Sequence, residues 1–287
     1  MTTLTKKRKI KTAYLLLIPG AAWLLFFFFF PLSSLLATSL KRPLGAAPED
    51  GFAYALQFSN YSNAIAEYWP YFVRAFTYAG IATLVCILLA YPIAYYMAFK
   101  ATKYKYLMLV LIVAPFFASF LLRTNAWKTI LSADGFVVGF LNALGALPEE
   151  RILSTSIAVV LGLIYNFLPF MILPLFISLD KIDKRLLEAA GDLYATGSQR
   201  FWKVVWPLSI PGVVSGVILT FIPASGDYIN AQLLGGVSDK MIGNVIQSQF
   251  IILRNYPQAS ALSFSFMAVI LVLIYLYLRR VGTKDLL

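Results

Sequence analysis

The stretch KIDKRLLEAAGDLYATGSQRFWKVVWPLSIP, from Lys181 to Pro211, is the segment around which this chain is organised. It is the longest polar interruption that carries charges of both signs, and a strongly apolar segment lies on each side of it. Its charges make it unsuitable as a membrane span, because burying charged side chains in lipid is costly. We therefore expect a loop with its own secondary structure between two spans.

Two short amphipathic helices are predicted within this loop. Asp183 can cap the first helix, in which apolar residues recur at helical spacing through Tyr194 and line one side. Thr196 and Gly197 end that helix and can cap a second one, which we expect Pro207 to end. The apolar face of such a pair must rest on its own bundle or on the groove of a partner protein.

Composition indicates a membrane protein. Hydrophobic residues make up 60% of the chain and charged residues 13%, with a mean hydropathy of +0.76. A soluble globule could not bury this much apolar surface. With no His and a single Cys, Cys86, an internal disulfide is excluded, and we expect no metal site. The chain also lacks a G-x-x-x-x-G-K-[ST] phosphate loop and any recognisable catalytic constellation, so we expect no enzyme activity.

The apolar runs predict an all-α, polytopic integral membrane protein. About six transmembrane helices are expected, at 13–40, 72–99, 106–122, 156–179, 208–224 and 259–278. They would form a single transmembrane domain over 1–287, with 181–207 as a cytoplasmic loop. Pro169 and Pro174 fall inside the fourth span, where neighbouring helices can satisfy the freed carbonyls.

The distribution of charge supports this topology. Segments expected inside carry 16 of the 24 Lys and Arg residues and 5 of the 13 Asp and Glu residues, so they hold the whole net charge of +11. This bias places both termini in the cytoplasm. We attribute the basic residues to topology and to anionic membrane lipid, and expect no nucleic-acid partner.

The loop resembles a known family motif. EAAGDLYATGSQRFWKVVWPLSIPG is similar to the EAA loop of ABC importer permeases, with Glu188, Ala189, Ala190 and Pro207 at matching spacing. The resemblance implies a type I ABC importer permease fold, in which this loop docks as a coupling helix on a cytoplasmic ATPase. The residues implied in ATPase coupling are Glu188, Ala189, Ala190, Asp192, Gly197, Arg200 and Pro207.

One position departs from the family pattern. The usual glycine falls six residues after the glutamate, where this chain has Tyr194, with Gly191 and Gly197 on either side. The departure leaves the conformation after the first helix undecided. One expectation is that the first helix continues for about one more helical turn, to Gly197.

A more specific resemblance covers most of the chain from the second span onward. VVWPLSIPGVVSGVILTFIPASGDYINAQLLGG and MIGNVIQSQF, with YPIAYYMAF nearer the amino terminus, look like the B-type permease of spermidine/putrescine importers. This implies a bacterial inner-membrane complex with a second homologous permease, an extracytoplasmic binding protein and an ATPase dimer. No cofactor is expected on this chain, because the ATPase would bind ATP and Mg.

Several residues are candidates for a substrate path. Asp227 and Tyr228, at the expected outer end of the fifth span, offer a carboxylate and an aromatic ring suited to an oligoamine. Tyr165 and Asn166 lie within the fourth span, where an amide is costly unless it faces a cavity or another helix. Alternatively, Asp227 caps a helix or pairs with Lys240, and Asn166 bonds a neighbouring helix.

Other interpretations remain open. Arg123, Asn125 and Trp127 could belong to a gate or to the surface that docks a binding protein. The cargo could be Fe(III), sulfate, thiamine or a phosphonate, although an oxyanion would fit a cationic path better than Asp227. An ion-gradient-driven carrier is disfavoured, because no inverted hydropathy repeat is evident and because such a carrier has no use for an EAA loop.

Overall fold

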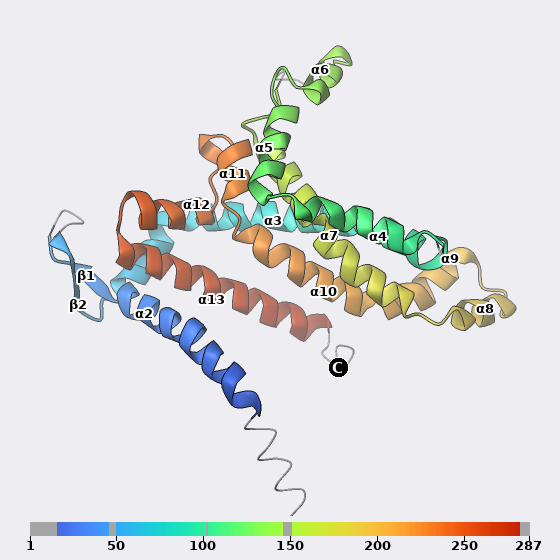
Figure 1. Cartoon of the computed structure of the whole chain (residues 1–287), viewed down its shortest axis with the longest axis horizontal. Coiled ribbons are helices and arrows are strands. Elements are labelled where there is room, and N and C mark those ends of the chain that lie inside the picture. The colour runs from blue at the N-terminus through green and yellow to red at the C-terminus, as the bar shows by residue number, and fades with distance from the viewer. Residues whose placement is uncertain (1–15, 46–49, 102, 146–150, 282–287) are drawn as a thin grey trace, which may run out of the picture. The chain divides into compact units, whose positions relative to one another are not determined.

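The computed structural model describes residues 16–45, 50–101, 103–145 and 151–281. The basic stretch 1–12, the start of the first predicted span and Lys284 lie outside them. Figure 1 labels the α-helices and the strands. The elements are η1 (Leu25–Phe29), α2 (Phe30–Ser39), β1 (Lys41–Pro43), β2 (Phe52–Tyr54), α3 (Ser59–Phe99), α4 (Lys105–Val113), η3 (Ala114–Phe117), α5 (Phe120–Ile130), α6 (Phe136–Ala143), α7 (Ser156–Asp180), α8 (Lys184–Asp192), α9 (Gly197–Arg200), η4 (Phe201–Val205), α10 (Trp206–Ser225), α11 (Ile229–Leu234), η5 (Val237–Asp239), α12 (Ile242–Gln247), η6 (Ser248–Ile252) and α13 (Tyr256–Val281).

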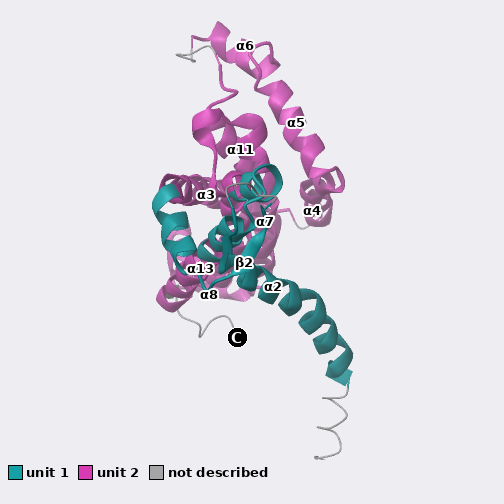
Figure 2. Cartoon of the chain, turned by 90° about the vertical axis from the view of Figure 1, so that its left-hand side faces the viewer, with its two compact units in different colours: residues 1–67, 246–265 teal, residues 68–245, 266–287 magenta. Residues whose placement is uncertain are grey.

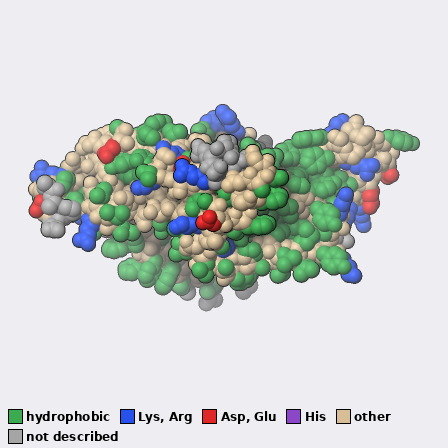
Figure 3. Space-filling model, turned by 90° about the horizontal axis from the view of Figure 1, so that it is seen from above, with side chains coloured by type: hydrophobic (Ala, Val, Ile, Leu, Met, Phe, Trp, Pro, Cys, Tyr) green, Lys and Arg blue, Asp and Glu red, His purple; other side chains and the backbone are tan. Residues whose placement is uncertain are grey.

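The fold is helical, as predicted, with helices long and apolar enough to cross a membrane. Among the described residues five such helices occur, or six if one bent pair counts as a span. Helix α7 continues through Pro169 and Pro174, in agreement with the sequence analysis. Hydrophobic side chains cover much of the face seen in Figure 3, which suits a surface that meets lipid.

The chain divides into two compact units, coloured separately in Figure 2. The first comprises 1–67 and 246–265 and contains a two-stranded antiparallel hairpin in which Lys41 pairs with Tyr54. The Asn60 amide donates to the carbonyls of Ser39 and Lys41, which ties the hairpin to the start of α3. Sequence analysis missed this hairpin. Helix α3 begins at Ser59, before the second predicted span, 72–99, and continues through it.

The second unit, 68–245 and 266–287, is built on the pair α7 and α10. Two glycines bring these helices close together. A Cβ atom at Gly212 would lie 2.5 Å from the Ser178 Cβ and 2.8 Å from the Pro174 carbonyl oxygen, and one at Gly216 would lie 2.5 Å from the Met171 sulfur. Small residues of this kind allow close backbone approach in membrane helices. We refer to these two helices as the α7/α10 pair.

The third predicted span, 106–122, is not a straight helix. α4 and η3 end at Phe117, and α5 starts at Phe120 after a bend of 93°. Ala118 and Ser119 have extended backbone conformations, with ψ of 146° and 140°, which break the helical hydrogen-bond ladder. The Arg123 guanidinium lies 4.4 Å from the centre of the Phe116 ring, a cation–π contact across the bend.

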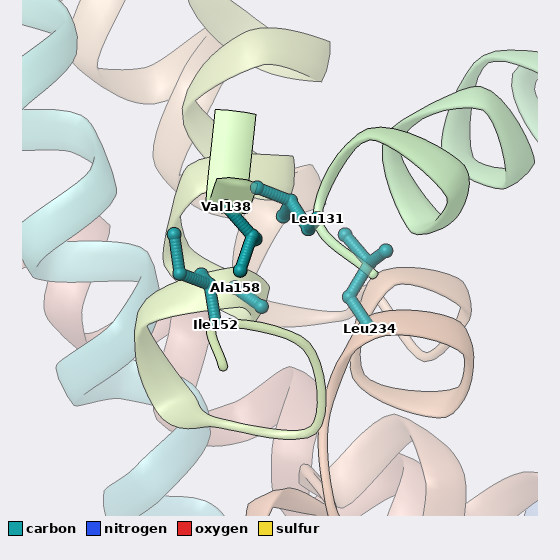
Figure 4. Packing of buried hydrophobic residues seen from close by; sticks show 5 residues of the cluster. All are labelled: Leu131, Val138, Ile152, Ala158 and Leu234. Carbon is teal, nitrogen blue, oxygen red and sulfur yellow. The ribbon is translucent and has the colours of Figure 1, made fainter. Parts of the chain in front are cut away.

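A small apolar cluster fixes the segment that follows the bend. Leu131, Val138, Ile152, Ala158 and Leu234 are buried together (Figure 4). They come from the end of α5, from α6, from both sides of the start of α7 and from α11. The cluster therefore joins α5 and α11 to one end of α7.

Candidate coupling loop and substrate path

Residues 181–207, the EAA-like loop, begin with the predicted capped helix. The Asp183 carboxylate accepts the backbone N–H of Arg185 at 3.0 Å and caps α8. α8 is strongly amphipathic, as its apolar spacing predicted. Its side chains are exposed or half-buried, with Leu186 48% exposed, so this helix leaves an apolar edge uncovered.

The end of α8 corrects the expectation that the helix runs on to Gly197. α8 ends at Asp192, and Tyr194 adopts a left-handed conformation with φ of 59°. The Tyr194 N–H donates to the Gly191 carbonyl and the Ala195 N–H to the Ala190 carbonyl, which is the bonding pattern of a Schellman turn. Tyrosine thus occupies the position that glycine usually holds, although a side chain there costs about 1–2 kcal/mol.

The second helix of the loop is capped as the sequence indicated. The Thr196 hydroxyl accepts the Gln199 N–H and the Gln199 side chain accepts the Thr196 N–H, a reciprocal capping box. Arg200 then links the two helices, because its Nε donates to the Ala195 carbonyl at 3.0 Å and its guanidinium lies over Gly191. The turn between α8 and α9 is therefore held from both sides.

Pro207 does not end the second helix, contrary to prediction. The helix is continuous from Gly197 to Ser225. Residues Phe201–Val205 form a π-turn, and the Trp206 N–H donates to the Phe201 carbonyl five residues back. A π-turn changes which carbonyl each N–H meets, so the missing N–H of Pro207 is accommodated at the join without a break.

Aromatic side chains attach this helix to α3. The Tyr91 ring lies 5.6 Å from the Phe201 ring and 5.4 Å from the Trp206 ring. The Ser209 hydroxyl donates to the Trp206 carbonyl, so Tyr91 is the donor in its 2.8 Å bond to Ser209. A movement of the loop would therefore displace side chains on both α3 and α10.

The residues implied in ATPase coupling are mostly available at the surface. Glu188, Ala189, Asp192, Gly197 and Pro207 are exposed. Ala190 and Arg200 are half-buried, and both contribute to the turn after α8.

At the opposite end of α10, Asp227 is buried and caps α11. Its carboxylate accepts the Asn230 N–H at 2.7 Å, so the capping alternative holds. The backbone carbonyl of Lys240, the alternative partner considered for Asp227, accepts a hydrogen bond from the Arg74 guanidinium. Burial raises the pKa of the Asp227 carboxyl to about 6, although the N–H groups of Asn230 and Ile229 act in the opposite direction. The carboxylate is thus held in a site that favours its neutral form.

Asn166 and Asp227 are brought together through Asn230. The Asn166 amide donates to the Asn230 carboxamide oxygen at 3.2 Å and to the Thr124 hydroxyl at 3.4 Å. We call Thr124, Asn166, Asp227 and Asn230 the polar network. Within the described part of the chain, the Asn166 Oδ1 atom is buried without a hydrogen-bond partner. Such atoms are costly unless something else bonds them.

The aromatic candidates lie beside this network or next to it in sequence. The Tyr165 ring lies 5.2 Å from the Trp127 ring at an interplanar angle of 60°, a contact that joins α7 to α5. Tyr228 is 39% exposed, and its carbonyl accepts the Asn244 amide at 2.8 Å. Sequence reasoning missed Asn230, although the Asp-x-x-Asn spacing from Asp227 is that of a helix cap.

Most of the chain matches a known protein family. Residues 87–282 match the family described as "Binding-protein-dependent transport system inner membrane component". This chain belongs to that family. It is an inner-membrane, multi-pass permease of a binding-protein-dependent transport system.

Individual relatives agree with this assignment. The chain is 40% identical over 260 residues, 90% of both chains, to the spermidine/putrescine transport system permease protein PotB of Haemophilus influenzae. It is 35% identical to PotB of Escherichia coli, over 92% of this chain and 96% of that one. The inner membrane ABC transporter permease protein YdcU of Escherichia coli is 36% identical over 74% of this chain and 72% of its own.

Solved structures show the same fold. A bacterial ABC transporter that imports the acidic polysaccharide alginate superposes with a TM-score of 0.69 at 16% identity, over 98% of both chains. The alginate transporter in complex with its pentasaccharide-bound periplasmic protein gives 0.75 at 17% identity, over 99% of both chains. The type I importer permease fold expected from the EAA-like loop is thereby confirmed.

Proposed function

We propose that this permease moves polyamines of the spermidine/putrescine class into the cytoplasm by alternating access. The observation that carries the proposal is 40% identity, over 90% of both chains, to a relative named for spermidine/putrescine transport. Fe(III), sulfate, thiamine and phosphonates are the competing cargoes.

The polar network supports a cationic cargo. Asp227 supplies a buried carboxylate, and the unbonded Asn166 Oδ1 supplies a further acceptor. A polyamine ammonium has only donors, so it can bond both groups, and the rings of Tyr165 and Tyr228 can add cation–π contacts. An oxyanion would meet the Asp227 carboxylate as a like charge.

The EAA-like loop supplies the connection to ATP. We place it in the cytoplasm together with both termini, on the strength of the positive-inside bias. There it would dock on an ATPase dimer that binds ATP and Mg, with Glu188 and Asp192 on the exposed face of α8. A second homologous permease and an extracytoplasmic binding protein would complete the complex. Closure of the ATPase dimer would turn the permease pair from inward-facing to outward-facing.

The test is ATP-dependent uptake of radiolabelled spermidine into vesicles that carry the complete complex. Putrescine, Fe(III), sulfate and thiamine serve as competitors. We expect competition by putrescine alone. Uptake of another cargo in the same assay would retain the transporter and overturn the polyamine assignment.

A further inference from the structure

The turn after α8 presents two large apolar side chains to solvent. Tyr194 is 95% exposed and Leu193 is 81% exposed. Neither side chain contributes to the turn, which is held by backbone bonds and by Arg200. An aromatic ring this exposed gains nothing from burial within its own chain.

The backbone argues against tyrosine at this position. With φ of 59°, Tyr194 lies in the left-handed region, where glycine is the least strained residue. The turn itself therefore does not explain the side chain. Position 194 carries a residue that its own backbone conformation disfavours, and this points to a use for the ring outside the chain.

The turn also fixes the backbone that carries the ring. Two Schellman bonds hold the backbone on one side, and the Arg200 to Ala195 bond holds it on the other. A ring on a fixed backbone loses little freedom on binding, and exposed aromatic residues of this kind often dominate protein interfaces.

We propose that Tyr194, together with Leu193, is the anchor by which the ATPase subunit recognises this loop, with the ring entering an apolar pocket on the ATPase. This inference rests on the proposed coupling function. The surface is continuous with the exposed face of α8, where Glu188 and Asp192 lie. The exposed part of α8 carries charges of both signs, because Lys184 and Arg185 lie on the same helix as Glu188 and Asp192. Such a mixed surface suits a protein partner, whereas a segment that binds anionic lipid is predominantly basic.

The test compares Y194G and Y194F with the unchanged permease in the full complex. Y194G relieves the backbone strain and removes the ring, so we expect unchanged or higher thermal stability together with about tenfold weaker binding of the ATPase. Y194F keeps the ring and should bind within about twofold of the unchanged permease. Wild-type affinity of Y194G for the ATPase would overturn the proposal.

A second measurement separates this inference from the proposed function. A photoreactive phenylalanine analogue at position 194 should crosslink to the ATPase; crosslinks only to lipid or to the second permease would overturn the anchor. The same analogue at position 188 reports on the loop as a whole. If position 188 crosslinks to the ATPase and position 194 does not, the anchor fails while coupling stands; if neither does, both fail.

Discussion

At the loop end of the α7/α10 pair, most side chains are exposed and local hydrogen bonds to backbone groups hold the structure, whereas at the α11 end polar side chains are buried and bond one another. The EAA-like loop leaves Glu188, Leu193 and Tyr194 open to solvent. The polar network instead buries Asp227 and Asn166. Exposed apolar groups suit a protein partner, while buried polar groups with free bonding capacity suit a small polar cargo.

The largest effect is expected where the two ends are joined. G212V places side-chain atoms against the Pro174 carbonyl and Ser178, which forces α7 and α10 apart. We expect a loss of about 3 kcal/mol in stability, and ATPase binding and substrate binding should fall together. Thermal unfolding of the purified protein measures this. G80V is the control, since a Cβ at Gly80 meets no atom within 4 Å; equal melting temperatures for the two variants would contradict the close approach.

The next change acts on the loop end alone. E188K reverses a charge on the exposed face of α8, and we expect uptake to fall at least about tenfold while spermidine binding and membrane insertion stay intact, because like charges at an interface are costly. Uptake and ATP hydrolysis are measured on the same vesicles. E188Q keeps the shape of the side chain, so its uptake rate should lie between those of the unchanged permease and E188K. Normal transport by E188K would remove Glu188 from the interface.

A third change acts on the α11 end alone. D227N keeps an oxygen that can accept the Asn230 N–H, so α11 remains capped, but it removes the negative charge. We expect the half-saturation concentration for spermidine to rise about tenfold with ATPase binding unchanged, because a charged hydrogen bond contributes about 1.5–3 kcal/mol. Unchanged uptake kinetics would exclude Asp227 from the path.

The smallest effect is expected from pH. With a pKa of about 6, Asp227 is mostly neutral at pH 5, so affinity for spermidine should be about fivefold lower there than at pH 7.5. The effect on stability has the opposite sign. Folding raises the pKa of the Asp227 carboxyl from 3.8. The contribution of the protonated carboxyl to stability is therefore full below pH 3.8 and is lost as pH rises through about 6. D227N should abolish both dependences, which the same uptake and unfolding measurements show.

Much of the loop end could be predicted from sequence because its signals are local. Asp183 and Thr196 each accept a hydrogen bond from a backbone N–H within three residues, so both caps can be predicted from the neighbouring sequence. The turn at Tyr194 was not predicted, because tyrosine disfavours a left-handed backbone conformation. The turn is enforced by the hydrogen bonds from the Tyr194 and Ala195 N–H groups. The prediction that Pro207 ends the helix was wrong for a similar reason, because residue spacing does not reveal the preceding π-turn.

The α11 end could be predicted only in part. Asp227 and Asn166 were singled out because polar groups near lipid are costly, but Asn230 and Thr124 join them through contacts between segments far apart in sequence. The bend before α5 also escaped prediction, because hydropathy is insensitive to the extended conformations of Ala118 and Ser119. Residue periodicity records which side chains share a helix face, and it does not record which helices meet.

The unbroken helix from Gly197 to Ser225 has a mechanical consequence. At 1.5 Å per residue its 29 residues form a rod of roughly 44 Å that starts in the EAA-like loop and ends two residues before Asp227. A push on the loop would be carried along this rod as a tilt or a slide. The rod can bend most easily where its helical hydrogen bonds are irregular, at the π-turn Phe201–Val205 and at Pro211 and Pro223, and the π-turn is the one of these sites that lies next to the loop.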